Sequence, residues 1–200
     1  MPALSEDRRF QELREALATS PPDLNDADLL SAQRLEAAVS IVVRAGADLD
    51  FLLIKRAISE RDPWSGHMAL PGGRWDQTDA SLIHTARRET QEETGVDLGR
   101  IGIPLGRLQD VSPSSTRLLN MRIAPFVFGV PSETEASVAS PEVNRVYWVP
   151  LDTLRATATG SSIEIYLPDE QRTFPSYHIA GEHVWGLTHR ILSDFLRIYR

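Results

Sequence analysis

The segment from Leu70 to Val96 reads LPGGRWDQTDASLIHTARRETQEETGV and joins two adjacent glycines to an expected helix. On that helix Glu89 precedes Glu92 by three residues and Glu93 by four. Because each residue turns an α-helix by about 100°, the three carboxylates share one arc beside an apolar stripe. Residues on the opposite side, which we expect to face water, are His84, Arg87 and Gln91.

This arrangement of acids favours a bound cation. Three like charges beside a buried stripe repel one another and need a compensating positive charge. Solvated helix acids are the alternative. However, Glu89, Glu92 and Glu93 lie late in the helix, where the macrodipole disfavours negative charge. Hard divalent ions prefer carboxylate oxygen, so the sequence predicts a site for Mg²⁺ or Mn²⁺.

Gly73 together with RETQEETGV at 88–96 resembles the Nudix box, G-x5-E-x7-R-E-U-x-E-E-x-G-U with U apolar. The spacing from Gly73 to the box arginine is one residue longer than in the general pattern. The middle glutamate position is taken by Asp79 or Ala80, and Thr90 stands at an apolar position. The resemblance identifies the chain as similar to the Nudix hydrolases.

The resemblance extends beyond the box, across most of residues 36–197. GGRWDQTDASL at 72–82 is similar to the GG-x-x-D-x-x-D-x-S-L boxes of the coenzyme A pyrophosphatase branch. LLIKRA at 52–57 and GHMALPGG at 66–73 resemble the upstream signature of that branch, with differences at Ile54, His67 and Leu70. HVWGLTHRILSDFL at 183–196 resembles its closing helix.

The resemblance implies an α/β (α+β) fold, a Nudix-type α/β/α sandwich with a mixed β-sheet. We expect residues 36–200 to form this domain and residues 1–35 to form an N-terminal helical extension. Within residues 5–18, Phe10, Leu13 and Leu17 recur at helical spacing before the stop signal at 20–22. Apolar segments predict strands at 37–43, 51–56, 102–108, 120–130 and 144–150, a short helix from 151, a hairpin at 177–179 and 182–185, and a closing helix at 188–199.

Composition is that of an ordinary globular enzyme. Of 200 residues, 42% are hydrophobic and 24% charged, enough for one domain with a core. A net charge of −7 argues against nucleic acid as a partner, and the absence of cysteine excludes disulfides and thiolate chemistry. No apolar run approaches the roughly 18 residues that span a membrane, and no signal-peptide pattern is present. We therefore expect a cytoplasmic location and no membrane partner.

The roles of the site residues follow from the resemblance and from phosphoanhydride chemistry. Metal would be bound by the carboxylates of Glu89, Glu92 and Glu93 and by the backbone carbonyl of Gly73, which a side chain there could obstruct. Arg88 matches the family arginine that orients a carboxylate by ion pairing. Divalent cations neutralise the phosphates and acidify a bound water, so hydrolysis of a diphosphate is the expected reaction.

Several residues outside the box are further candidates. Glu142 matches the place where family members put an additional acid, as a metal ligand or general base, and Glu133 and Glu135 compete for that role. Candidate phosphate-binding residues are Arg56, Arg61 and Arg74, with surface salt bridges as the alternative. Aromatic residues that either stack on an adenine ring or pack in the core are Trp64, Trp75, Tyr147 and Trp185.

None of the five histidines is counted as a metal ligand. His178 and His183 are five residues apart on expected strands and are predicted to face opposite ways.

The sequence supports two classes of function. One is a metal-dependent diphosphohydrolase of a small-molecule nucleoside diphosphate derivative. Coenzyme A and its thioesters lead, followed by ADP-ribose, nucleotide sugars and nucleoside triphosphates. The other is a Nudix-like module that senses such a nucleotide without cleaving it, although an inert module would be expected to lose a box acid. Dimers are common in the family, so the N-terminal helix either pairs two copies in a homodimer or packs on its own core.

Overall fold

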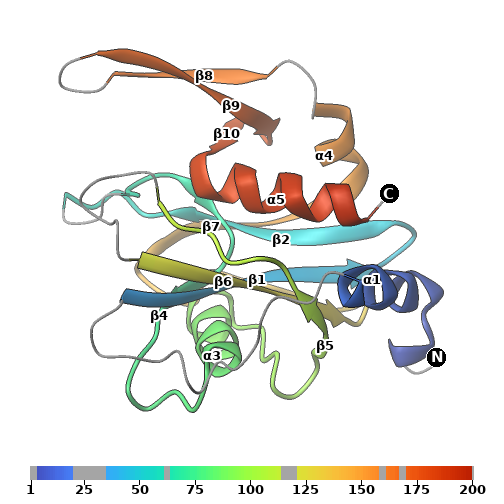
Figure 1. Cartoon of the computed structure of the whole chain (residues 1–200). Helices are drawn as coiled ribbons and strands as arrows, with labels where there is room; N and C mark the ends of the chain where they lie inside the picture. Colours follow the sequence, from blue (N-terminus) through green and yellow to red (C-terminus); the bar gives the residue numbers. More distant parts are fainter. Residues whose placement is uncertain are drawn as a thin grey trace.

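The computed structural model describes residues 4–19, 35–60, 64–113, 121–157, 161–166 and 170–199 (Figure 1). The central sheet has seven strands, with β3 (Met68–Ala69), β2 (Leu49–Arg56), β1 (Leu35–Ala45), β6 (Met121–Val130) and β5 (Ile103–Arg107) in that order. Strand β4 (Gly72–Arg74) also pairs with β1, and β7 (Val143–Pro150) pairs with β2. Because β1 and β6 are parallel and the other pairs antiparallel, the sheet is mixed, as predicted.

Helices cover both faces of this sheet (Figure 1). One face carries α3 (Leu82–Thr94), which contains the three box acids. The other face carries α5 (Gly186–Ile198), together with α4 (Leu151–Thr157) and a second sheet. That second sheet has three strands, β8 (Ser162–Tyr166), β9 (Gln171–Ile179) and β10 (Glu182–Trp185). The predicted mixed α+β sandwich is therefore confirmed, with an additional small sheet on one side.

Strand β1 is buried on both faces. Its side chains point alternately into two hydrophobic clusters, one on each side of the sheet. Ala38 and Val42 belong to the cluster beneath α3, whereas Ile41 and Val43 belong to the cluster on the side of α5. Successive side chains of a strand point to opposite faces, so a continuous apolar run is what a strand between two helical layers needs.

The N-terminal helix α1 (Arg8–Ala18) packs onto its own chain. It begins after the short 3₁₀ turn η1 (Leu4–Glu6), because the Asp7 carboxylate caps the helix by accepting a hydrogen bond from the Arg9 backbone N–H. Its apolar residues Phe10, Leu13 and Leu17 are buried in the cluster shared with β5 and α5, as the helical spacing predicted. This apolar face is consequently not available to pair two copies of the chain.

The predicted strands and the closing helix lie within a few residues of their expected positions, except that β9 begins at Gln171 instead of at 177. The short strands β3 and β4 and the strand β8 were not predicted. β3 and β4 contain two and three residues, too few for a visible periodicity, and β8 exposes alternate residues without a buried side chain. The stop signal at 20–22 lies outside the described residues.

In the described part of the chain, no helix is long and apolar enough to cross a bilayer.

The packing of α1 yields a stability prediction. Replacing the fully buried Leu13 by Ala should lower the free energy of unfolding by about 2–5 kcal/mol, the usual effect of a cavity in a packed core. Denaturant melts of the purified variant measure this, with Glu15→Ala on the exposed side of the same helix as the matched control. Equal stability of the two variants would mean that α1 does not contribute to the core.

Candidate active site

Helix α3 is held over β1 by apolar contacts and by hydroxyl groups. Leu82 and Ala86 are fully buried in the cluster below it. Thr90, at the box position that is usually apolar, is also fully buried; its Oγ1 contacts Ser40 Oγ at 2.8 Å and donates to the Ala86 carbonyl at 2.7 Å. The threonine is tolerated because its hydroxyl has partners. Gly95, at φ 71°, ends the helix in the left-handed conformation with its N–H on the Gln91 carbonyl.

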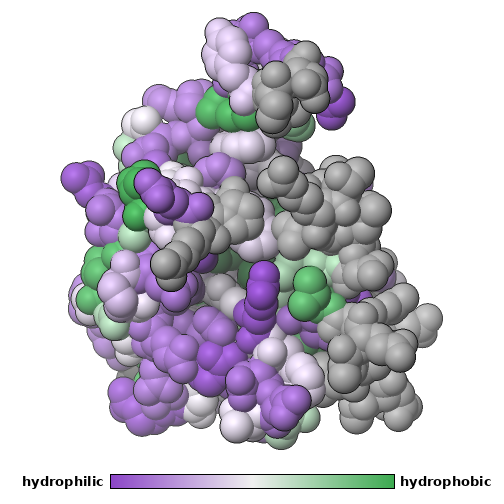
Figure 2. Space-filling model, turned by 90° about the vertical axis from the view of Figure 1, so that its left-hand side faces the viewer, coloured by the Kyte–Doolittle hydropathy of each residue, from purple (hydrophilic) through white to green (hydrophobic). Residues whose placement is uncertain are grey.

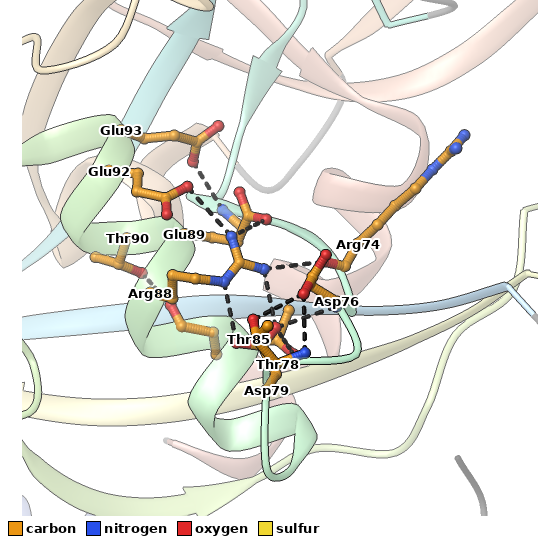
Figure 3. Close-up of polar contacts among 12 residues, drawn as sticks. Arg74, Asp76, Thr78, Asp79, Thr85, Arg88, Glu89, Thr90, Glu92 and Glu93 are labelled. Atoms are coloured by element: carbon orange, nitrogen blue, oxygen red, sulfur yellow. Dashed lines mark hydrogen bonds and ion pairs between the residues drawn. The ribbon is translucent and has the colours of Figure 1, made fainter. Parts of the chain in front are cut away.

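Arg88 is the centre of the polar network on this helix (Figure 3). Its Nε and Nη2 donate to the two carboxylate oxygens of Asp79, at 3.0 and 2.9 Å. Nη1 donates to Glu89 at 2.8 Å and to Glu92 at 3.2 Å, and Nη2 also reaches the Arg74 carbonyl at 3.1 Å. These contacts raise the pKa of the guanidinium further, chiefly through its hydrogen bonds with Asp79. Arg88 thus contacts Glu89, the carboxylate that the resemblance expects it to orient.

Asp79 is a residue whose role the sequence did not reveal. Burial raises the pKa of its carboxyl, but hydrogen bonds from Arg88, the Asp76 N–H and the Thr85 hydroxyl outweigh that effect and lower the pKa overall. Asp76 in turn accepts from the N–H and hydroxyl of Thr78, which closes the turn before the helix. Of the two residues considered for the middle acid of the box, Asp79 therefore fixes the arginine.

The glycine pair lies close to both the sheet and the helix. A Cβ on Gly72, at φ 152°, would come within 2.3 Å of the Ala38 carbonyl oxygen. A Cβ on Gly73 would come within 2.4 Å of the Glu89 carboxylate carbon. Glu89 is therefore pressed against the backbone of the glycine loop, and burial raises the pKa of this carboxyl despite its contact with Arg88.

Glu93 forms the second half of the site with Arg56 and Glu142. Its side chain is buried and accepts from the Gly72 N–H at 2.9 Å. Arg56 lies between two acids, with Nη1 3.7 Å from Glu93 and Nη2 3.7 Å from Glu142. Burial raises the pKa of Glu93 to about 8, although the Gly72 N–H and Arg56 act in the opposite direction. The pairing of β2 with β7, and the hydrogen bond from the Ala57 N–H to the Glu142 carbonyl, bring Glu142 to this edge.

The other candidates lie elsewhere or are incompletely placed. Glu133 and Glu135 line a surface pocket beyond the end of α3, beside Gly95, whereas Glu142 contacts Arg56. The Arg74 side chain extends away from the acids (Figure 3), and only its carbonyl belongs to the network. Arg61 lies outside the described residues.

Two expectations were wrong. Arg87 does not face water but is half-buried, with its guanidinium 5.7 Å from the Phe128 ring centroid. His178 and His183 do not face opposite ways, because the hairpin pairs them directly and their ring centroids lie 5.2 Å apart. Residues directly opposite in an antiparallel pair share a face, whereas residues five apart along one strand would face opposite ways.

The groups at this edge suit a hard divalent cation. Five carboxylates face two guanidinium groups, and the members are Asp79, Glu89, Glu92, Glu93, Glu142, Arg56 and Arg88. In their ionised forms the acids outnumber the arginines, and the donors are oxygen atoms of the kind that Mg²⁺ and Mn²⁺ prefer. Within the described residues, no three acidic or histidine side chains are close enough together to bind one metal ion. Arg88 lies between Glu89 and Glu92 and donates a hydrogen bond to each. Because Gly73 has no side chain, the Glu89 carboxylate packs directly against its backbone, in the space that a Cβ would occupy.

Comparison with known proteins places this geometry in a family context. Residues 34–167 match the sequence model of the NUDIX domain. The chain is similar to NudL, an uncharacterised Nudix hydrolase of Yersinia pestis (strain Pestoides F), with 30% identity over 187 residues, covering 92% of this chain and 88% of that protein. A segment of 117 residues is 37% identical to an uncharacterised protein of Schizosaccharomyces pombe, covering 57% of this chain but only 36% of the yeast protein. The crystal structure of a MutT/nudix family protein from Enterococcus faecalis is similar to this chain, with a TM-score of 0.52 and 17% identity. The match covers 98% of this chain and 71% of that one, and it supports the fold alone.

The raised pKa of Glu93 predicts how the metal-free protein responds to pH. A carboxyl whose folded pKa is about 8 stabilises the fold below its unfolded pKa, and this contribution is lost as pH rises toward 8. In chelator, the melting temperature of the wild type should therefore fall from pH 5 to pH 8 more steeply than that of Glu93→Gln. Glu92→Gln, at an acid whose side chain is 56% exposed, is the control. Parallel pH profiles for wild type and Glu93→Gln would contradict this prediction.

Proposed function

Because the chain belongs to the Nudix hydrolases, enzymes that hydrolyse phosphoanhydride bonds of nucleoside diphosphate derivatives and generally use divalent metals, we propose that it cleaves coenzyme A or its thioesters. The observation that supports a working site is Arg56, held between Glu93 and Glu142 beside the glycine loop and the Arg88 network. Acids, guanidinium groups and a glycine loop at one edge are what binding and hydrolysis of a diphosphate require.

Each group can be given a task from its contacts. A divalent cation held by Glu89, Glu92, Glu93 and the Gly73 carbonyl would neutralise the diphosphate and acidify an attacking water. Arg88 keeps the Glu89 carboxylate aimed at the glycine loop, and Asp79 keeps Arg88 in place through two hydrogen bonds. Arg88 therefore acts as a positioning residue.

Arg56 is suited to bind a phosphate oxygen. Its guanidinium lies 3.7 Å from both Glu93 and Glu142, beside the glycine loop and the box acids. The planar guanidinium also matches the geometry of two phosphate oxygens.

Glu142 is the proposed general base. Its side chain is 72% exposed and lies 3.7 Å from Arg56, so Oε2 can accept a proton from a water at the open side of the site. We prefer Glu142 to Glu133 and Glu135, because Glu142 contacts Arg56, whereas the latter two line a pocket beside Gly95.

The coenzyme A branch is supported by the same turn that holds the arginine. The Asp76 and Asp79 spacing within GGRWDQTDASL is the feature that resembles that branch, and here Asp79 binds Arg88 while Asp76 closes the turn. Retention of Glu89, Glu92 and Glu93 favours hydrolysis over a module that only senses the nucleotide.

The metal role of the acids gives the first prediction for activity. Glu92→Gln or Glu93→Gln should lower kcat on the order of 100-fold or more, because each removes a charge that stabilises the transition state. Excess chelator should abolish turnover in the wild type. Rates are measured by phosphate-ester product release, with Glu135→Gln, an exposed acid beside Gly95, as the matched control. Near wild-type rates in both box variants would place the catalytic centre elsewhere.

The substrate proposal is tested with a panel of diphosphates at equal concentration in Mg²⁺ or Mn²⁺. Coenzyme A should be cleaved within the diphosphate to 3′,5′-ADP and 4′-phosphopantetheine, identified by mass. It should be preferred over dephospho-coenzyme A, because a site that pairs with the 3′-phosphate would leave its groups unpaired in the analogue. A clear preference for ADP-ribose or a nucleotide sugar would reject the coenzyme A branch and leave the Nudix chemistry intact.

A further inference from the structure

Three aromatic rings meet where β10 ends and α5 begins, and we call His67, Phe174 and Trp185 the aromatic cluster. The Trp185 ring centroid lies 4.7 Å from that of His67 and 5.4 Å from that of Phe174, with interplanar angles of 54° and 42°. All three side chains are half-buried. Phe174 and Trp185 lie on the paired strands β9 and β10, and the fold brings His67 to them from a distant segment.

The aromatic cluster borders the catalytic edge through the pairing of β2 with β3. Ile54 pairs with Ala69 and Lys55 with Met68, and the Arg56 N–H donates to the His67 carbonyl at 2.9 Å. This register continues the ladder, so that His67 lies opposite Arg56, whose guanidinium contacts Glu93 and Glu142. The ring that contacts Trp185 is thus attached beside the residue proposed to bind phosphate.

Packing in the core does not account for Trp185 and Phe174. Among the residues that the structure describes, Trp64 and Tyr147 pack against one hydrophobic cluster and Trp75 against the other, whereas Trp185 and Phe174 belong to neither. Half-buried aromatic rings outside the core are available to contact a ligand.

The position of the aromatic cluster on the surface agrees with this. The N-terminal end of α5, next to Trp185, lies on the left-hand side in Figure 1. Figure 2 shows that side, which carries the β8–β9 hairpin at its top and is hollowed below it. Phe174 belongs to this hairpin, and the hollow lies below it.

We infer that the aromatic cluster stacks on the purine base of the nucleotide substrate, with the diphosphate at Arg56 and Glu93. This inference rests on the proposed function and adds which residues recognise the base. Every base offers a π-face, and stacking on Trp or His binds it without a specific hydrogen-bond code. Phe174 and Trp185 lie beyond residues 34–167, which match the NUDIX domain, so base recognition comes from the C-terminal part of the chain.

The test compares two non-hydrolysable ligands that differ by the nucleoside, α,β-methylene-ADP and methylenediphosphonate, in calorimetric titrations with Mg²⁺. Trp185→Ala and Phe174→Ala should weaken binding of the nucleotide about tenfold or more and leave methylenediphosphonate within about twofold. Trp185→Phe, which keeps a ring, should retain most of the affinity. Tyr166→Ala, at an aromatic side chain 79% exposed on β8, is the matched control.

Two results would overturn the inference. One is unchanged nucleotide affinity in Trp185→Ala and Phe174→Ala, and the other is an equal loss for both ligands, which would indicate a structural role. Thermal melts identify a variant that fails to fold, in which case Phe174→Ala and Trp185→Phe carry the comparison.

Hydrolysis by the same proteins separates the two proposals. If wild type cleaves a diphosphate and Trp185→Ala keeps the same KM, only the stacking site is rejected. If wild type cleaves no diphosphate of the panel, the proposed function is rejected. A higher KM with little change in kcat in Trp185→Ala supports stacking.

Discussion

The close approach of the Gly72–Gly73 backbone to both β1 and α3 is the constraint on which the site depends. The space for a Cβ is taken by the Ala38 carbonyl on one side and the Glu89 carboxylate on the other. Because the loop lies this close to the helix, the Gly72 N–H can reach Glu93, and Glu89 is pressed against bare backbone. Any side chain in the loop would separate the helix from the sheet and disperse the acids.

This proximity creates an electrostatic problem that the arginines relieve. Buried carboxyl groups resist ionisation, as the raised pKa values of Glu89 and Glu93 show. Arg88 reduces the repulsion on one side through four hydrogen bonds to acids, and Arg56 does so on the other. Both arginines are themselves fixed, Arg88 by Asp79 and Arg56 by its place in a paired strand. The fold therefore holds Arg88 and Arg56 in fixed positions, and their positive charges allow the carboxylates to lie close together.

Periodicity and local motifs predicted most of the elements and the common helix of Glu89, Glu92 and Glu93, because both are properties of nearby residues. The same approach failed where partners come from distant segments. Thr90 could be seen as a departure from the box, but its compensation by Ser40 depends on how α3 lies on β1. The meeting of Arg56 with Glu142 depends on the pairing of β2 with β7, and Asp79 could be placed only once Arg88 was seen to turn toward it.

Strand β2 connects two parts of the molecule through the alternation of its last two residues. Lys55 points toward the C-terminal sheet and pairs with Glu182 at 2.6 Å, whereas Arg56 points toward the box helix and Glu93. The two cations therefore pair with acids of different layers, Lys55 with Glu182 and Arg56 with Glu93. The C-terminal sheet can thus be remodelled over evolutionary time while the hydrolytic edge beneath it stays intact. Such a division would let one reaction be retained while the molecules it acts on diversify.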